Sequence, residues 1–315
     1  MSLDILSMIM TVVGLCLFET VSSLDNAVIN AEVLHTMSAR ARKWFLLWGI
    51  LFAVFIVRGI LPLIIIWWTA PQLGLWGAFT ATFSSDPRAV EAIETAAPIL
   101  LVGGGIFLVF LFFHWLFLEP KMYGLHTERT ERFFERHGVW FFAIVSIFLA
   151  IITWFALQKN PLMAFSAVIG STAFFITHGF KQNAEKMEHQ MIHGKGHLSD
   201  WSKIMYLEVI DSTFSIDGVL GAFAFTLSIP LILIGNGLGA LVVRQVTVGN
   251  IERVKKYKLL KNGAMYSILI LGAIMIAESF GVHIPSIVAP LSTLAVLGYF
   301  FYQAKKQFKM TQVTS

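Results

Sequence analysis

Long apolar runs separated by short polar stretches dominate this chain. A transmembrane helix needs roughly 20 apolar residues, and nine of the runs approach or exceed that length. The pattern predicts an all-α fold with helices at 4–36, 44–68, 97–118, 138–157, 162–180, 202–227, 229–247, 262–281 and 285–303. The segment 76–94 is too polar to span, so we expect an outer loop or a short interfacial helix there.

Acids interrupt two of these runs at the same spacing. The first run contains Glu19-Thr20-Val21-Ser22-Ser23-Leu24-Asp25-Asn26, and the sixth contains Asp211-Ser212-Thr213-Phe214-Ser215-Ile216-Asp217-Gly218. The two octapeptides align without a gap. A charge at the centre of a bilayer costs roughly 2.5–3.5 kcal/mol on insertion scales, so repeated acids at this depth indicate function. We interpret the pair as an internal repeat whose two copies build one site.

The composition supports membrane insertion. Hydrophobic residues make up 57% of the 315 residues and charged residues only 13%, against about 25% charged in soluble domains. The net charge of +4 does not indicate nucleic-acid binding, because the basic residues lie in short loops. The single cysteine, Cys16, excludes an intramolecular disulfide. No Lys or Arg precedes Arg40, so we expect no signal peptide and a retained N-terminus.

The basic residues predict the orientation, because cytoplasmic loops of membrane proteins are enriched in Lys and Arg. With the N-terminus outside and the C-terminus inside, 20 of the 23 basic residues lie inside. They are Arg40, Arg42, Lys43, Lys121, Arg129, Arg132, Arg136, Lys181, Lys186, Lys195, Lys203, Arg244, Arg253, Lys255, Lys256, Lys258, Lys261, Lys305, Lys306 and Lys309.

This topology makes the two acidic motifs antiparallel, since an odd number of crossings separates them. Inverted repeats with a site near the midplane are typical of secondary transporters. We therefore predict four parts: a first repeat (1–118, including the outer loop 69–96), an insert of cytoplasmic loops and two helices (119–201), a second, inverted repeat (202–284), and a last helix with a basic tail (285–315).

The predicted site is rich in oxygen ligands. Successive acids in each motif point roughly 120° apart on a helix, so two crossed helices with local breaks are needed to surround one ion. We expect the breaks at Ser22-Ser23 and at Gly218 and Gly221. Carboxylate and carbonyl oxygens suit hard divalent cations. The expected ligands are Glu19, Asp25, Asn26, Asp211 and Asp217.

Three further charged residues could balance or gate such a site: Arg58, Arg244 and Glu208. Clustered carboxylates repel one another and take up protons when no cation is bound. Exchange of the cation for protons is therefore the natural mechanism. A histidine-rich segment holds His189, His193 and His197, which could bind metal or form a solvated loop.

The motifs resemble a known family. Glu19-x5-Asp25-Asn26 and Glu208-x2-Asp211-x2-Phe214-Ser215-Ile216-Asp217 are similar to the paired motifs of the TerC family of integral membrane proteins, named for tellurium resistance. Arg58, Gly103–Gly105 and Val282-His283-Ile284-Pro285 fit that family as well, over about residues 10–290. The resemblance implies manganese export or metal supply to secreted enzymes. Gly218 and the following Val and Leu stand where the family usually has Ser and Pro, and the insert 119–203 is long, which indicates a divergent branch.

We thus expect a multi-pass transporter in the bacterial inner membrane that exports Mn²⁺, with Ca²⁺ or Mg²⁺ as alternatives, in exchange for protons. Its partners would be the bilayer, the cation and protons, and it could form a homo-oligomer or bind stress-response proteins. No cofactor other than the transported cation and no enzymatic activity are expected, since the chain contains neither His-Glu-x-x-His nor Gly-x-Ser-x-Gly. The alternative is a non-transporting scaffold for metal delivery or tellurite resistance.

Cysteine labelling tests the predicted orientation. In a Cys16→Ser background, a cysteine at Ser84 should react with an impermeant maleimide from outside intact cells, and a cysteine at Thr127 should react only after the cells are opened. Labelling of position 127 in intact cells would reverse the orientation.

Overall fold

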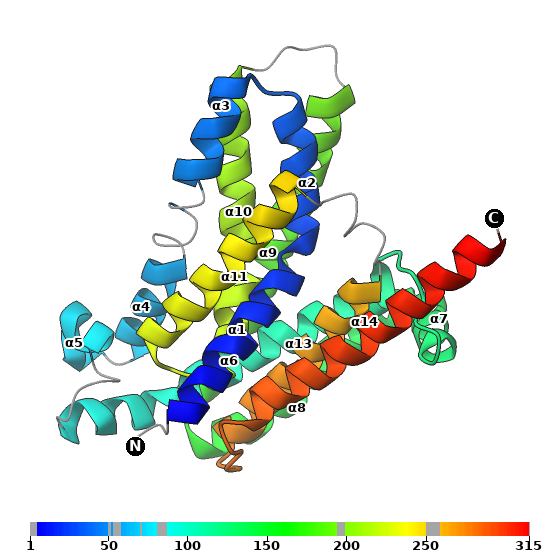
Figure 1. Cartoon of the computed structure of the whole chain (residues 1–315). Coiled ribbons are helices and arrows are strands. Elements are labelled where there is room, and N and C mark those ends of the chain that lie inside the picture. The colour runs from blue at the N-terminus through cyan, green and yellow to red at the C-terminus, as the bar shows by residue number, and fades with distance from the viewer. Residues whose placement is uncertain are drawn as a thin grey trace.

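The computed structural model describes residues 5–49, 52, 58–69, 71–80, 87–193, 199–249 and 259–314, and every regular element in these ranges is a helix (Figure 1). The first half contains α1 (Ile5–Ser22), α2 (Leu24–His35), α3 (Ala39–Trp44), the π-helix η1 (Phe45–Gly49), α4 (Arg58–Thr69), the 3-10 turn η3 (Pro71–Leu73), α5 (Gly74–Thr80), α6 (Pro87–Leu118) and α7 (Glu128–Arg136). The second half contains the 3-10 turn η5 (Gly138–Trp140), α8 (Phe141–Lys159), α9 (Pro161–His193), α10 (Asp200–Ala222), α11 (Ile229–Gly249), α13 (Leu259–Ser279) and α14 (Val288–Thr314).

Six stretches of the described residues are helical, long and apolar enough to cross a membrane. They are Ile5–Ser22, Glu94–Leu118, Gly138–Lys159, Pro161–Asn183, Ile229–Val246 and Leu259–Ser279. The predicted all-α, multi-pass membrane fold is confirmed. Helix α10 is not in this set, and it carries five charged residues. The count of nine spans and their orientation stay predictions.

Two helices are longer than their apolar runs predicted. Helix α9 continues to His193, so Lys181 and Lys186 are helical and not in the loop expected there. The extension is rich in Lys, Gln, Ala, Glu and Met, which favour helix even where they are polar. Helix α6 begins at Pro87, ten residues before the predicted start, and proline is well suited to a first helical position.

Helix α6 lies at the centre of the bundle. Within its span 78% of the residues are buried, against 17% for α8. It packs on α13, α9 and α8, and its buried side chains include Phe107, Phe110 and Trp115. In Figure 1, α13 and α14 run side by side below, while α2, α10 and α9 stand next to one another above them. Because so little of α8 is buried, this helix has the exposed apolar surface expected of a helix that faces lipid.

Glycines allow the central helices to approach closely. A Cβ at Gly170 of α9 would lie 2.1 Å from the carbonyl oxygen of Gly103 on α6. On another face of α6, a Cβ at Gly105 would lie 3.0 Å from the carbonyl oxygen of Gly272 on α13. Small residues at such contacts are typical of helix association in membranes, where van der Waals packing replaces the hydrophobic effect. The Gly103–Gly105 run thus places α6 between two helices.

A buried carboxylate holds one end of the bundle together. Glu131 of α7 is fully buried, and it accepts hydrogen bonds from the Gly124 amide at 3.0 Å and the Thr127 hydroxyl at 2.7 Å. Asn262 and Tyr266 of α13 also donate to it, at 3.2 Å each to Oε1. Donors from two segments offset the desolvation of this charge, which fixes α7 against α13.

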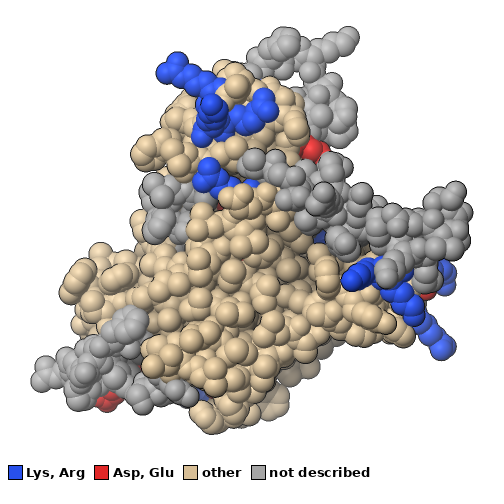
Figure 2. All heavy atoms as spheres, viewed as in Figure 1, with Lys and Arg blue, Asp and Glu red and all other residues tan. Residues whose placement is uncertain are grey.

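Basic side chains gather at particular places on the surface. Figure 2 shows Lys and Arg atoms over α3 at the top and beside α7 at the right of the molecule. Arg40 and Lys43 of α3, and Arg129 and Arg136 of α7, are exposed. Both groups belong to the loops that the charge pattern predicted to lie inside.

The α6–α9 crossing generates a stability prediction. Gly170→Ala would place a methyl group against backbone that cannot move away, so it should lower the free energy of unfolding by about 1–3 kcal/mol. Gly179→Ala on the same helix is the control. No described atom lies within 4 Å of its added Cβ, and the loss of chain entropy in the unfolded state should make it neutral or stabilising by up to about 1 kcal/mol. Thermal unfolding in detergent measures both, and equal melting temperatures would show that the contact is not tight.

Candidate functional site

The first acidic motif lies at the junction of α1 and α2. The predicted break occurs at Ser23, but it is shallow, because the backbone hydrogen bonds from Ser23 to Glu19 (3.1 Å) and from Ala27 to Ser23 (3.0 Å) continue across it. The break predicted in the second motif is wrong. Gly218 and Gly221 are helical within α10, and their missing side chains make room for Glu19 and Phe18 of α1.

The two motifs face each other in antiparallel order. Glu19 lies against Gly218, while Asn30, eleven residues later, contacts Asp211, seven residues earlier. This is the direction that the predicted inversion requires. The contacts place two acids, Glu19 and Asp211, along the interface between α1–α2 and α10, while Asp217 of α10 faces α9.

Glu19 is fully buried between three helices. Its Oε1 accepts a hydrogen bond from the Ser23 hydroxyl of its own helical segment. A Cβ at Gly218 of α10 would lie 2.6 Å from Glu19 Oε2, and a Cβ at Gly239 of α11 would lie 2.6 Å from Glu19 Cβ. Two glycines therefore make the space for this carboxylate, one on each neighbouring helix.

Asp211 is buried as well, with 6% of its surface exposed. The Asn30 side-chain amide donates a hydrogen bond to Asp211 Oδ1 at 2.9 Å, and the Ser215 hydroxyl donates to the Asp211 carbonyl oxygen at 2.5 Å. The hydroxyl thus bonds to its own helix, as serine often does inside helices. Asn30, one turn beyond Asn26, was not predicted as a site residue.

Asp217 forms an ion pair with Lys181 of α9. The side chains are only 14% exposed for Lys181 and 12% for Asp217. The pair uses Oδ2, and Oδ1 is buried without a hydrogen-bond partner among the described residues. A buried ammonium paired with a buried carboxylate offsets part of a large desolvation penalty. Sequence reasoning missed Lys181 because it placed this residue in a loop.

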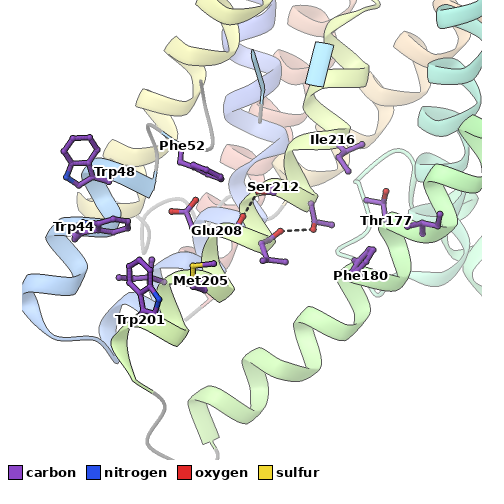
Figure 3. Close-up of a pocket in the computed structure, with 14 residues that line it drawn as sticks. Trp44, Trp48, Phe52, Thr177, Phe180, Trp201, Met205, Glu208, Ser212 and Ile216 are labelled. Atoms are coloured by element: carbon purple, nitrogen blue, oxygen red, sulfur yellow. Dashed lines mark hydrogen bonds between the residues drawn. The ribbon is translucent and has the colours of Figure 1, made fainter. Parts of the chain in front are cut away.

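Glu208 occupies a different face of α10. Figure 3 shows it in a groove between α9 and the α3–η1 segment, which has a volume of about 1120 Å³ and is lined by Trp44, Trp48, Phe52, Phe180, Trp201 and other apolar residues. Neither carboxylate oxygen has a hydrogen-bond partner among the described residues. A Cβ at Gly49 would lie 2.3 Å from Glu208 Oε1, so the π-helix passes directly over the acid.

Several predicted residues cannot be placed as ligands. The side chains of Asp25, Asn26 and Arg58 lie outside the described residues, although their backbone is helical in α2 and α4. The same holds for the side chains of His189 and His193, and for the whole of His197. Arg244 is half-buried on α11. Among the side chains described, no three from His, Cys, Asp and Glu are grouped so as to hold a metal ion. The five-ligand cage therefore stays a prediction.

The fold and these contacts define a class: a multi-pass integral membrane protein in which buried acids line the interface of two antiparallel helical segments. Residues 24–309 match the family model described as "Protein of unknown function (DUF475)", and the chain belongs to that family.

Curated relatives match over part of their length. The UPF0053 inner membrane protein YoaE of Escherichia coli K12 is 22% identical over 182 residues, which are 53% of this chain and 35% of that protein. The uncharacterized membrane protein YceF of Bacillus subtilis is 32% identical over 85 residues, or 27% of this chain and 33% of that protein. The chain thus spans about a third of the length of these relatives. No solved structure gives a significant match.

The Lys181–Asp217 pair predicts a non-additive effect on stability. Asp217→Asn and Lys181→Met should each lower the free energy of unfolding by about 3–5 kcal/mol, because each leaves one buried charge without its partner. The double variant should be more stable than either single variant, since no charge is then left unpaired. Thermal unfolding in detergent gives the coupling, and additive losses would mean that the pair contributes nothing as a pair.

Proposed function

We propose that this protein is a divalent-cation transporter of the bacterial inner membrane that exchanges Mn²⁺ for protons at the acids between α1–α2 and α10. The observation that carries the proposal is the burial of three acids on neighbouring helices: Glu19 and Asp211 lie between α1–α2 and α10, and Asp217 lies between α10 and α9. Intramembrane acids are rare and mark ion pathways. The oxygen-rich ligand set favours a hard cation such as Mn²⁺, with Ca²⁺ and Mg²⁺ as alternatives.

The ion pair suggests how the empty site is neutralised. The Lys181 ammonium already supplies one positive charge to Asp217. A divalent cation that binds Asp217 would take the place of this ammonium, so binding and release would be coupled to movement of Lys181 relative to α10. Ser23 and Asn30 provide weaker, neutral donors to the other two acids, which a cation could also replace.

The proposed membrane location and the proposed substrate are supported by similarity to other proteins. The printed name of YoaE places that protein in the inner membrane. The resemblance of the two motifs to the TerC family supports manganese as the cation and export as the direction. The acidic lining argues against tellurite as a substrate, because buried carboxylates repel an oxyanion.

Mn²⁺ binding tests the site. Asp25→Asn and Asp217→Asn each remove one anionic ligand from a medium of low dielectric, which should weaken Mn²⁺ binding by about 3 kcal/mol or more, roughly 100-fold. Because both residues act on one ion, the double variant should be little worse than either single variant. Isothermal titration calorimetry on purified protein measures the affinities, and Glu94→Gln, an exposed acid of α6, is the control.

Two results would contradict the proposal. Wild-type affinity in both single variants would make these acids structural. Binding without Mn²⁺ flux in sealed proteoliposomes would favour the scaffold alternative, in which the protein holds metal but does not carry it.

A further inference from the structure

A second cluster of titratable side chains lies outside the acidic interface. His114 of α6 and His178 of α9 lie side by side, with ring centroids 3.8 Å apart and an angle of 51° between the rings. His114 is 7% exposed, and Phe174 and Phe141 cover it. Burying an imidazole costs free energy unless its nitrogens are hydrogen-bonded, and His114 Nδ1 is buried without a hydrogen-bond partner among the described residues.

On one side, the pair connects to the basic end of the bundle. His114 Nδ1 lies 3.3 Å from Glu119 Oε1, and Glu119 Oε2 lies 3.0 Å from Lys261 Nζ. Exposure increases along this series, from 8% for the His114 side chain to 29% for Glu119 and 38% for Lys261. The buried imidazoles therefore reach the aqueous surface through two charged side chains.

On the other side, the pair approaches the acidic interface. His178 precedes Lys181 by three residues, so both lie on the same face of α9. Lys181 in turn holds Asp217. The Gln182 amide nitrogen lies 2.9 Å from His178 Nε2 and helps to fix the ring. One series of polar side chains thus runs from the surface at Lys261 to the buried ion pair.

We propose that His114 and His178 form a proton relay between the basic end of the bundle and the acidic interface. The inference rests on the proposed function, because exchange of a divalent cation for protons requires a path by which protons reach and leave the site. Histidine suits this role because its unperturbed pKa lies close to physiological pH, and chains of Asp, Glu and His side chains mark proton relays in membrane transporters.

The proton balance of the relay is simple. A proton from solution binds His114 beside Glu119, passes to His178 across the ring contact, and goes from His178 to the Asp217 carboxylate, which accepts it as the cation departs, while the Lys181 ammonium keeps its own proton. Each ring gives up the proton that it takes, so both return to the neutral form. The reverse order releases protons when a cation binds, and two protons move for each divalent cation.

The charged groups around His114 and His178 favour this movement of protons. Burial alone would raise the pKa of Glu119, but the neighbouring His114 ring and the charge of Lys261 hold it below its ordinary value. Glu119 is therefore an anion at neutral pH, 3.3 Å from His114 Nδ1. The two rings are in contact, so a positive charge on one opposes a positive charge on the other. The relay therefore passes one proton at a time.

Two kinds of flux separate the relay from the cation site. His114→Gln and His178→Gln keep a hydrogen-bonding side chain that cannot carry a proton. In proteoliposomes, each should slow net Mn²⁺/H⁺ exchange at least tenfold, while radioactive Mn²⁺ self-exchange and Mn²⁺ affinity stay within twofold of the wild type, because self-exchange moves no net protons. His137→Gln, an exposed histidine at the end of α7, is the matched control.

The opposing outcomes are distinct. Unchanged net exchange in both variants would overturn the relay. An equal loss of self-exchange would also overturn it, since the histidines would then be needed for the movement of the helices. If the wild-type protein carries Mn²⁺ without moving protons, the relay is contradicted but the proposal of a Mn²⁺ transporter stands. If the wild-type protein carries no Mn²⁺, the proposed function itself is contradicted.

A spectroscopic measurement tests the pair without transport. With ¹⁵N-labelled histidine, a pH titration of the purified protein followed by NMR should show that protonation of His114 and of His178 is coupled, so His178→Gln should shift the titration of His114. If the two rings titrate independently, the relay is wrong whatever the flux measurements show.

Discussion

A carboxylate buried between helices in a bilayer cannot form hydrogen bonds to water, and this constraint determines which residues surround Glu19, Asp211 and Asp217. Each of the three acids has a different protein partner in place of water. Glu19 has a serine donor and the space left by two glycines, Asp211 has the amide of Asn30, and Asp217 has the ammonium of Lys181. The residue types on α2, α9, α10 and α11 at these contacts follow from the acids they surround. A change at any of them leaves a buried polar group without a partner, which is among the largest single penalties that a fold can incur.

The helices themselves could be predicted, because length and apolar content are local properties. The runs at 4–36 and 138–157 agree with α1–α2 and η5–α8 within a few residues. The errors arose where polar residues continue a helix. The end of α9 has strong helix formers but no apolar run, so a hydropathy argument ends the helix too early, although helix propensity would have extended it.

The candidate site was less accessible to sequence reasoning. The acids stand out because they interrupt apolar runs, but their partners do not. Lys181 and Asp217 are 36 residues apart, and Asn30 and Asp211 are 181 residues apart. No local pattern connects such pairs. Gly218 was misread for a similar reason: a glycine near an acid can break a helix or make room for a neighbour, and only the position of Glu19 on α1 decides between the two.

The long, unbroken α9 has a mechanical consequence. It crosses α6 at the glycine contact between Gly170 and Gly103, and this contact can act as a fulcrum. Lys181 lies eleven residues further along the helix, or about 16 Å at 1.5 Å per residue. A tilt of roughly 10° about the fulcrum would therefore carry Lys181 by about 3 Å, enough to separate it from Asp217. His178 would move with it, because both are fixed to the same rod. One small rotation of a single helix would thus open an ion pair and shift a ring contact at the same moment.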